Sequence, residues 1–267
     1  MSEKKLRPIV ECYNVDEEYL YLKPYLFIAG YAAGKKFTHT PKALPLARRI
    51  HNGQYRKALV EINGEVVRLP YVLHVLKVCD TLISLNIPMS DEDLDILCTC
   101  ALLHDALEDA EDFFPQGGVE FERDYGFPPI VGETINLLSK HSGADEYELN
   151  AYFNALKINK FALLVKLADR SHNVESLYVM KNVPKYIKET RDYFLFKNGL
   201  CAYGRQNYPE LSHAITILKG KILSLTEATE AMLHRQNEIV AEKDAKIAEL
   251  EAEIKRLKSA NRMKNID

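Results

Sequence analysis

Two adjacent residues near the middle of the chain, His104 and Asp105, have the types needed to bind a divalent metal ion. A neutral imidazole nitrogen beside a carboxylate oxygen suits a cation of intermediate hardness. Glu108 and Asp109 follow one helical turn later, where they could orient a water molecule or take a proton from it. On a helix these four polar groups form one patch. The segment therefore indicates a metal site with an acidic pair beside it.

The acidic residues also have a simpler interpretation. Glu108 and Asp109 are followed by Glu111 and Asp112, so the run could be the solvated end of a helix. The helix macrodipole favours cations near a C-terminus, so four acidic residues there run against this interpretation. The patch alone leaves both interpretations open.

Two other segments place polar residues in apolar surroundings. His74 lies at the apolar start of a helix after Pro70, where a histidine is more often a hydrogen-bonded core residue than a ligand. Asp169 ends the apolar run that begins at residues 161–165, and a buried carboxylate is costly unless it is paired or coordinates a metal. Its neighbour Arg170 could supply the pairing, which is the alternative to metal binding.

Helices are expected to position these side chains. From Leu44 to about Leu223 the sequence reads as successive amphipathic helices separated by Pro, Gly and polar residues, which predicts an all-α fold. The best-marked helix starts at Ser90, the first residue of an S-x-x-D capping pattern. Apolar residues at helical spacing are expected to carry this helix through His104 to about Asp109.

One short segment departs from the helical pattern. Asn63 and Gly64 form a residue pair that favours a two-residue type I′ turn. The pair is flanked by apolar residues typical of short strands, namely Val60, Ile62, Val66 and Leu69. A small β-hairpin is therefore predicted within residues 58–69.

The C-terminal part of the chain has the pattern of a coiled coil. Residues 225–258 contain no Pro, Gly or aromatic residue, and Gln236 and Lys243 interrupt the first half of the heptad pattern. The apolar heptad positions are Leu233, Val240, Ile247, Leu250, Ile254 and Leu257. Ile at position a with Leu at d favours a parallel dimer, so we expect a homo-oligomer formed through this helix. The alternative is a solvated helix that packs on its own domain.

Composition limits the partners and the compartment. The hydrophobic share of 47% and the charged share of 27% are those of a globular protein. A net charge of -3 gives no general attraction to phosphate backbones, so no nucleic-acid polymer is expected as a partner. No apolar signal region or membrane span is recognisable, which predicts a cytoplasmic location. The five cysteines, with no C-x-x-C spacing, suit free thiols, and we expect Cys98 and Cys100 in the core.

Four ordered motifs resemble a known family. They are His51-x-Gly53-Gln54-x-Arg56-Lys57, Pro70-Tyr71-x-x-His74, Ala101-Leu102-Leu103-His104-Asp105-x-x-Glu108-Asp109 and Lys166-Leu167-Ala168-Asp169-Arg170-x-His172-Asn173. Their H…HD…D order resembles the HD superfamily. The residues within each motif resemble still more closely those of the hydrolase domain of RelA/SpoT proteins and of the small alarmone hydrolases. The resemblance covers roughly residues 44–200 and implies an HD-domain helical bundle.

The resemblance implies residue roles and a reaction. A single Mn²⁺ ion would be held by four ligands: His74, His104, Asp105 and Asp169. Glu108 and Asp109 would form the catalytic acidic pair. Four residues match positions near the substrate, Arg56 and Lys57 as basic groups and Asn173 and Ser176 as nucleotide contacts. The implied reaction is hydrolysis of the 3′-pyrophosphate of (p)ppGpp, which gives GDP or GTP and pyrophosphate.

The helical pattern and the family resemblance together divide the chain into three expected parts. We expect an N-terminal segment (1–43) packed on the domain, an HD hydrolase domain (44–223) and a C-terminal helix (224–267) that forms a coiled coil. The family usually has only a few residues between Lys57 and Pro70, so the hairpin is an insertion that would line the pocket and change substrate choice. No synthetase-like segment follows the hydrolase region. Two alternatives stay open: an HD phosphohydrolase for another phosphorylated nucleotide, and a catalytically silent nucleotide-binding or scaffold protein.

Overall fold

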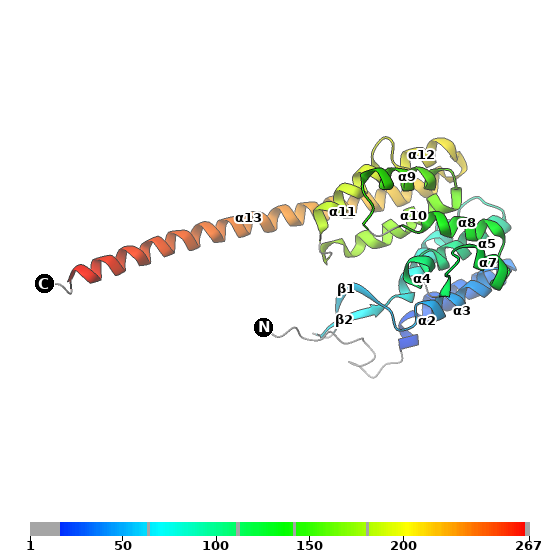
Figure 1. The fold of residues 1–267 in the computed structure, drawn as a ribbon, viewed down its shortest axis with the longest axis horizontal. Coiled ribbons are helices and arrows are strands. Elements are labelled where there is room, and N and C mark those ends of the chain that lie inside the picture. Colours follow the sequence, from blue (N-terminus) through cyan, green and yellow to red (C-terminus); the bar gives the residue numbers. More distant parts are fainter. Residues whose placement is uncertain (1–16, 63–64, 111–112, 141–142, 180–181, 265–267) are drawn as a thin grey trace. The chain divides into compact units, whose positions relative to one another are not determined.

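The computed structural model describes residues 17–62, 65–110, 113–140, 143–179 and 182–264. These residues are mainly helical and include one two-stranded sheet, which confirms the predicted all-α fold with a small hairpin (Figure 1). The chain divides into two compact units, Met1–Leu225 and Thr226–Asp267.

The elements follow one another in a simple order. In the described part of the first unit the helices before α13 are α2 (Glu17–Lys35), α3 (Thr40–Ile50), α4 (Val72–Ser84), α5 (Asp91–Leu103), α6 (Ala106–Asp109), α7 (Val119–Tyr125), α8 (Pro129–Leu138), α9 (Glu146–Lys157), α10 (Lys160–Asn173), α11 (Val183–Glu189) and α12 (Leu200–Asn207). Shorter segments connect the later helices: the 3₁₀ turns η2 (Val174–Val179) and η4 (Pro209–Leu211), and the π-helical turn η3 (Thr190–Leu195). Strands β1 (Tyr55–Ile62) and β2 (Glu65–Pro70) lie between α3 and α4, and the long helix α13 (Ser212–Lys264) ends the described chain.

Helices α4, α5 and α10 form the part of the core that carries the polar motifs. Helix α4 packs against α5 and α10, and α5 also contacts α10 and α3. Large aliphatic side chains on these three helices are fully buried, including Leu76, Leu82, Leu97, Leu102, Leu103 and Leu163. Full burial of one such side chain stabilises the fold by about 1.5–3 kcal/mol. The three helices therefore form a rigid base for the polar residues at their ends.

The predicted helix from Ser90 to Asp109 is correct at its start and wrong at its end. The Ser90 side chain accepts a hydrogen bond from the Asp93 amide at 3.1 Å, as the capping pattern predicts. Helix α5 then ends at Leu103, and α6 begins at Ala106. The break lies at Asp105, whose φ of -97° and ψ of 3° leave the helical region. At this break the Asp105 carboxylate accepts a hydrogen bond from the Tyr71 hydroxyl, which comes from outside the helix.

The hairpin is longer than expected. Strands β1 and β2 pair antiparallel, and β1 begins at Tyr55, earlier than the predicted Ala58. Arg56 and Lys57 therefore lie on β1 itself, in a part of the strand where the pairing register is irregular. The predicted turn at Asn63 and Gly64 lies outside the described residues.

Other expectations concern burial and membranes. Cys98 and Cys100 are fully buried, as predicted, and the cysteines that the structure describes are free thiols. Within residues 17–264, apart from the short gaps named above, no helix combines the length and the apolar character needed to cross a membrane.

Asp95 on α5 joins the start of α3 to this core. Its carboxylate accepts hydrogen bonds from the backbone amides of Thr38 at 2.7 Å, His39 at 2.9 Å and Thr40 at 2.7 Å. The Thr40 hydroxyl adds a fourth bond at 2.7 Å. Burial raises the pKa of Asp95, but the bonds from Thr40, His39 and Thr38 outweigh it and hold this pKa below its usual value. An acid from another helix thus caps α3, where residue 39 supplies no side-chain cap.

We expect Asp95→Asn to lower the free energy of unfolding by about 1–3 kcal/mol at neutral pH, because an amide offers one acceptor oxygen and no charge. The pKa of Asp95 is lower in the folded protein than in the unfolded chain. The extra free energy of unfolding of the wild type is therefore complete above the unfolded pKa of about 3.9, and it is lost as the pH falls through the folded pKa. Urea denaturation of both proteins between neutral pH and about pH 3 measures this difference. A difference that does not narrow on acidification contradicts the assignment.

Candidate metal centre

Three helices bring the four predicted metal ligands together. His74 lies in the first turn of α4, His104 and Asp105 follow the end of α5, and Asp169 lies on α10. One ligand atom from each of His74, His104 and Asp105 lies within 4.8 Å of the others. Asp169 Oδ1 lies 3.2 Å from His74 Nε2 and 3.8 Å from His104 Nε2. Asp105 Oδ2 lies 3.1 Å from His104 Nε2. Residues far apart in the sequence therefore converge on one small volume.

Both imidazoles present a buried Nε2 atom that lacks a hydrogen-bond partner in the described structure. The His104 Nδ1 atom lies 2.8 Å from the Ala101 carbonyl oxygen, so Nδ1 carries the proton and donates it. In the neutral ring this leaves the Nε2 lone pair free. Buried polar atoms are nearly always satisfied, and two lone pairs beside two carboxylates are what a divalent cation satisfies. The residues therefore fit one metal ion.

His172 selects the tautomer of His74. The Nδ1 atoms of the two rings are 2.7 Å apart, so one must donate and the other accept. Burial, together with the neighbouring His74 and Arg56, lowers the pKa of His172 to about 3. His172 is therefore neutral, and it accepts through Nδ1 when its own proton sits on Nε2, the atom that lies 4.0 Å from Glu175 Oε2. In that state His74 donates from Nδ1 and turns its Nε2 lone pair toward the carboxylates.

The charges of the centre demand positive partners. Burial raises the pKa of Asp105, but His104 and His74 outweigh it and hold this pKa well below its usual value. Burial likewise raises the pKa of Asp169, and Lys166 with the two imidazoles brings it well below the usual value. Burial lowers the pKa of His104, but Asp105 and Asp169 raise it to about 10. Two ionised carboxylates therefore attract a positive charge at the imidazole Nε2 atoms, which a metal ion supplies as well as a proton does.

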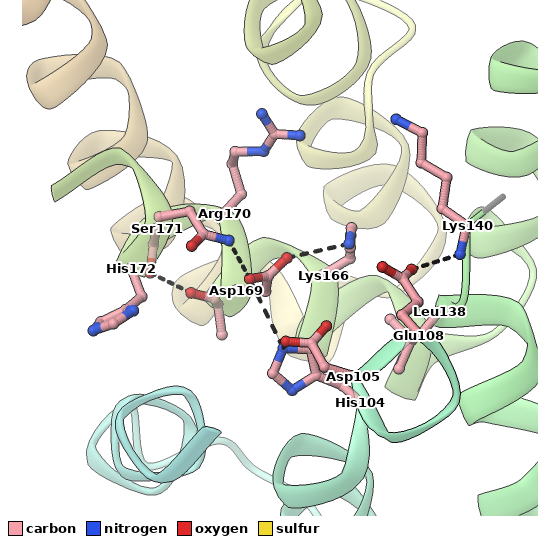
Figure 2. Close-up of polar contacts among 12 residues, drawn as sticks. His104, Asp105, Glu108, Leu138, Lys140, Lys166, Asp169, Arg170, Ser171 and His172 are labelled. Carbon is pink, nitrogen blue, oxygen red and sulfur yellow. Dashed lines mark hydrogen bonds and ion pairs between the residues drawn. The ribbon is translucent and has the colours of Figure 1, made fainter. Parts of the chain in front are cut away.

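Asp169 is satisfied by partners other than the one considered from the sequence. Lys166 Nζ lies 3.2 Å from Asp169 Oδ2 (Figure 2). Asn173 Nδ2 donates to Asp169 Oδ1 at 2.5 Å. Arg170 instead pairs with Glu189 at 2.5 Å, and its side chain projects away from His104 and Asp105 in Figure 2. The interpretation that Arg170 neutralises Asp169 is therefore wrong.

The acidic pair lies on α6, just beyond the helix break. Glu108 Oε1 accepts a hydrogen bond from the Lys140 backbone amide at 2.6 Å (Figure 2). Burial raises the pKa of Glu108 despite the opposing effect of this bond. Burial and the charge of Asp105 raise the pKa of Asp109. Carboxylates with raised pKa values are suited to proton exchange with a reacting water. The other acids of the run, residues 111–112, lie outside the described residues.

The four residues matched to substrate contacts are placed unequally. Arg56 Nη2 donates to Asn173 Oδ1 at 2.8 Å, and Asn173 in turn donates to Asp169. The Ser176 hydroxyl lies 3.4 Å from the Asn173 carbonyl oxygen. Lys57 is exposed on β1. Arg56 and Asn173 are thus connected to a ligand of the centre, Ser176 adjoins them, and Lys57 makes no hydrogen bond or ion pair with the site residues described here.

Sequence reasoning gave no role to Tyr71, Lys166 or His172. The Tyr71 hydroxyl donates to Asp105 Oδ2 at 2.7 Å and so fixes that carboxylate. Lys166 could have been found, because a lysine inside an apolar helix is costly unless an acid lies three or four residues away, as Asp169 does. For Tyr71 and His172 the only signal was their place within the motifs.

We expect His172→Phe to lower Mn²⁺ affinity by about 10- to 100-fold, because His74 loses the acceptor that fixes its tautomer. Isothermal titration calorimetry of the two proteins measures the change. The matched control is His213→Phe, since His213 is exposed on α13. Equal affinities for the wild type and the His172 variant contradict the role assigned to His172.

Comparisons with known proteins point in one direction. No protein-family model matches the chain. A protein of Oryza sativa subsp. japonica, provisionally named GTP diphosphokinase RSH1, chloroplastic, is 26% identical over 264 residues, which cover 88% of this chain and 28% of that protein. A Borreliella burgdorferi protein named guanosine-3′,5′-bis(diphosphate) 3′-pyrophosphohydrolase is 30% identical over 145 residues, which cover 53% of this chain and 19% of that protein. The chain thus spans less than a third of the length of either relative.

A solved structure was also found, described as a metazoan ortholog of SpoT that hydrolyzes ppGpp and plays a role in starvation responses. It covers 72% of this chain and 95% of that chain, with 20% sequence identity and a TM-score of 0.48. Similarity to the two curated relatives confirms the resemblance to RelA/SpoT-type hydrolase domains that the four motifs indicated.

Proposed function

We propose that residues 44–223 form a metal-dependent hydrolase domain that removes the 3′-pyrophosphate of (p)ppGpp, giving GDP or GTP and pyrophosphate. The observation that carries the proposal is the pair of buried imidazole Nε2 atoms without hydrogen-bond partners, set beside two ionised carboxylates. Similarity to a relative named as a 3′-pyrophosphohydrolase supports this choice of substrate. Residues 1–43 would serve as a segment that packs on the domain.

The proposed cofactor is one Mn²⁺ ion held by four residues: His74, His104, Asp105 and Asp169. When bound, such a cation lowers the pKa of a water ligand and offsets negative charge at phosphorus. Glu108 has one oxygen fixed by the Lys140 amide, so its other oxygen can accept a proton in a defined direction. Asp109, on the same helical turn, would share the handling of that proton.

The basic residues on β1 would bind the pyrophosphate. Arg56 can form two parallel hydrogen bonds to phosphate oxygens, and Lys57 adds a point charge. Asn173 holds Arg56 beside Asp169, so the guanidinium lies next to the metal ligands. Because both ends of the Asn173 amide are already bonded, its proposed contact with the nucleotide would replace one of these bonds. Ser176 is the neighbouring candidate for a nucleotide contact.

The hairpin gives a reason to keep a second substrate in view. Arg56 and Lys57 lie on β1, so the inserted residues continue the same strand beyond the phosphate-binding groups. The insertion would therefore line the pocket and alter the choice of nucleotide. A metal and two basic residues bind phosphate without reading the base, so another phosphorylated nucleotide is the alternative substrate. A catalytically silent nucleotide-binding or scaffold protein is the third alternative, and it gives no role to the acidic pair.

With Mn²⁺ present, the purified protein should release pyrophosphate from (p)ppGpp. The double variant Glu108→Gln/Asp109→Asn should lose at least about 100-fold in kcat, because proton transfer is removed, while still binding Mn²⁺. The control is Glu122→Gln/Asp124→Asn, which removes two exposed acids on α7. A panel of phosphorylated nucleotides assayed for phosphate and pyrophosphate covers the alternative substrates. Absence of turnover on the whole panel by the Mn²⁺-loaded wild type would falsify the enzymatic proposal.

We also propose that α13 forms a coiled coil with a second copy of the chain. Within the second unit, five apolar side chains at heptad positions are between 51% and 59% exposed: Val240, Ile247, Leu250, Ile254 and Leu257. In a parallel, in-register pair each g position meets the e position of the next heptad in the partner. With Ile247 at a, Lys246 would lie opposite Glu251 of the second copy, and Glu253 would lie opposite Lys258. Each of these pairs joins opposite charges. The proposed partners are a nucleotide substrate and a second copy of the chain. We propose no nucleic-acid polymer or membrane as a partner, and a cytoplasmic location.

Sedimentation equilibrium of the full chain should show a dimer. Ile247→Glu/Ile254→Glu should yield monomers, because it buries like charges in the a layer of the coil. Ala245→Glu/Ala252→Glu adds the same charge at the exposed f positions and should leave the dimer intact. A monomeric wild type, or equal effects of the two double variants, rules out this coiled coil.

A further inference from the structure

Glu189 at the end of α11 contacts basic side chains from two segments that adjoin the proposed metal ligands or the acidic pair. Its Oε1 atom lies 2.5 Å from Arg170 Nη2, and its Oε2 atom lies 3.4 Å from Lys140 Nζ. Arg170 directly follows the metal ligand Asp169 on α10. Lys140 lies just after α8 and donates its backbone amide to Glu108. One carboxylate therefore links α10 to the residue whose backbone amide hydrogen-bonds to Glu108.

The Arg170 end of this link is rigid. Its side chain is 5% exposed, and its guanidinium carbon lies 4.1 Å from the centroid of the Tyr186 ring and 4.2 Å from that of Phe194. Two aromatic rings this close to the guanidinium leave the planar group little freedom. Arg170 Nη1 also donates to the Thr190 hydroxyl at 3.0 Å. Glu189 is thus held by a cation that is itself fixed in the core.

At the other end of the link, Lys140 makes two contacts, one through its backbone amide and one through its side chain. Its backbone amide donates to Glu108 Oε1 (Figure 2). Its side chain forms an ion pair with Glu189. The ion-paired groups of Lys140 and Glu189 are 28% and 16% exposed, so water screens their attraction only in part. Because the ion pair restrains the Lys140 side chain, it also limits the movement of the backbone that bears this side chain. The amide then constrains one oxygen of Glu108 and leaves the other free.

We propose that Glu189 is a positioning residue for hydrolysis, which fixes the Glu108 carboxylate through Lys140. This inference rests on the proposed function in one respect, namely that Glu108 takes part in proton transfer. Glu189 itself touches neither the metal ligands nor the acidic pair through any contact in the described structure. In this proposal its effect on rate passes through Lys140 to Glu108, and not through Arg170 to Asp169.

The kinetic test is a double-mutant cycle on the full chain with Mn²⁺ and (p)ppGpp. Glu189→Gln should lower kcat by about tenfold and leave KM within about twofold, because it misplaces a group used in the transition state. In a Glu108→Gln background the same change should have no further effect on kcat. Asp192→Asn is the matched control, since Asp192 lies three residues away and forms an ion pair with Lys188 instead. An equal loss of kcat in both backgrounds overturns the proposal.

Lys140→Met tests the same route from its other end and leaves the Arg170 pair intact, so it decides the matter even if Glu189→Gln does not fold. It should reproduce the tenfold loss of kcat. An unchanged kcat in Lys140→Met means that Lys140 does not carry the effect and overturns the proposal.

A structural readout separates this inference from the enzymatic proposal. Hydrogen exchange at the Lys140 amide should become about tenfold faster in Glu189→Gln, because the Lys140 side chain loses its ion pair and the backbone becomes less restrained. The exchange rate should stay unchanged in Asp192→Asn. This result is independent of turnover, so it holds even if the wild type hydrolyses none of the nucleotides. Unchanged protection in the Glu189 variant overturns the positioning role, whether or not the protein is an enzyme.

Discussion

Two ionised carboxylates buried beside two imidazoles set the constraint on which this structure depends. Asp105 and Asp169 are almost enclosed by α4, α5 and α10, and burial of a carboxylate is tolerated only with compensating charge or hydrogen bonds. Lys166 supplies one positive charge. The His74 and His104 Nε2 atoms provide the place for the rest, so the core of the fold and the proposed metal site meet the same electrostatic requirement.

The surrounding residues act on the atoms that face away from this centre. Ala101 holds the distal nitrogen of His104, and His172 holds that of His74. Tyr71 bonds to Asp105, and Asn173 bonds to Asp169. Each bond fixes the direction of one ligand before any cation binds, which reduces the entropy lost on binding. The break between α5 and α6 belongs to this arrangement, because it lets Asp105 and the acidic pair face the site from separate helical segments.

The sequence was informative where chemistry depends on residue type and local spacing. It predicted the helical class, the Ser90 cap, the hairpin and the four side chains that converge. It could not show that α5 ends before His104, because the residues at the break make contacts, such as that of Asp105 with Tyr71, to chain more than thirty residues earlier. It also favoured Arg170 as the alternative partner of Asp169, since neighbours in sequence are easily paired, whereas the helix directs Arg170 toward Glu189. Contacts between distant helices decide such points, and periodicity does not record them.

We propose that these four side chains bind one divalent cation together. Anomalous X-ray scattering from crystals grown with Mn²⁺ is a sharp test, because the signal comes from the metal alone. A single strong peak is expected within coordination distance of the Nε2 atoms of both imidazoles and of one oxygen from each of Asp105 and Asp169. A peak held by other residues, or the absence of a peak at saturating Mn²⁺, contradicts it.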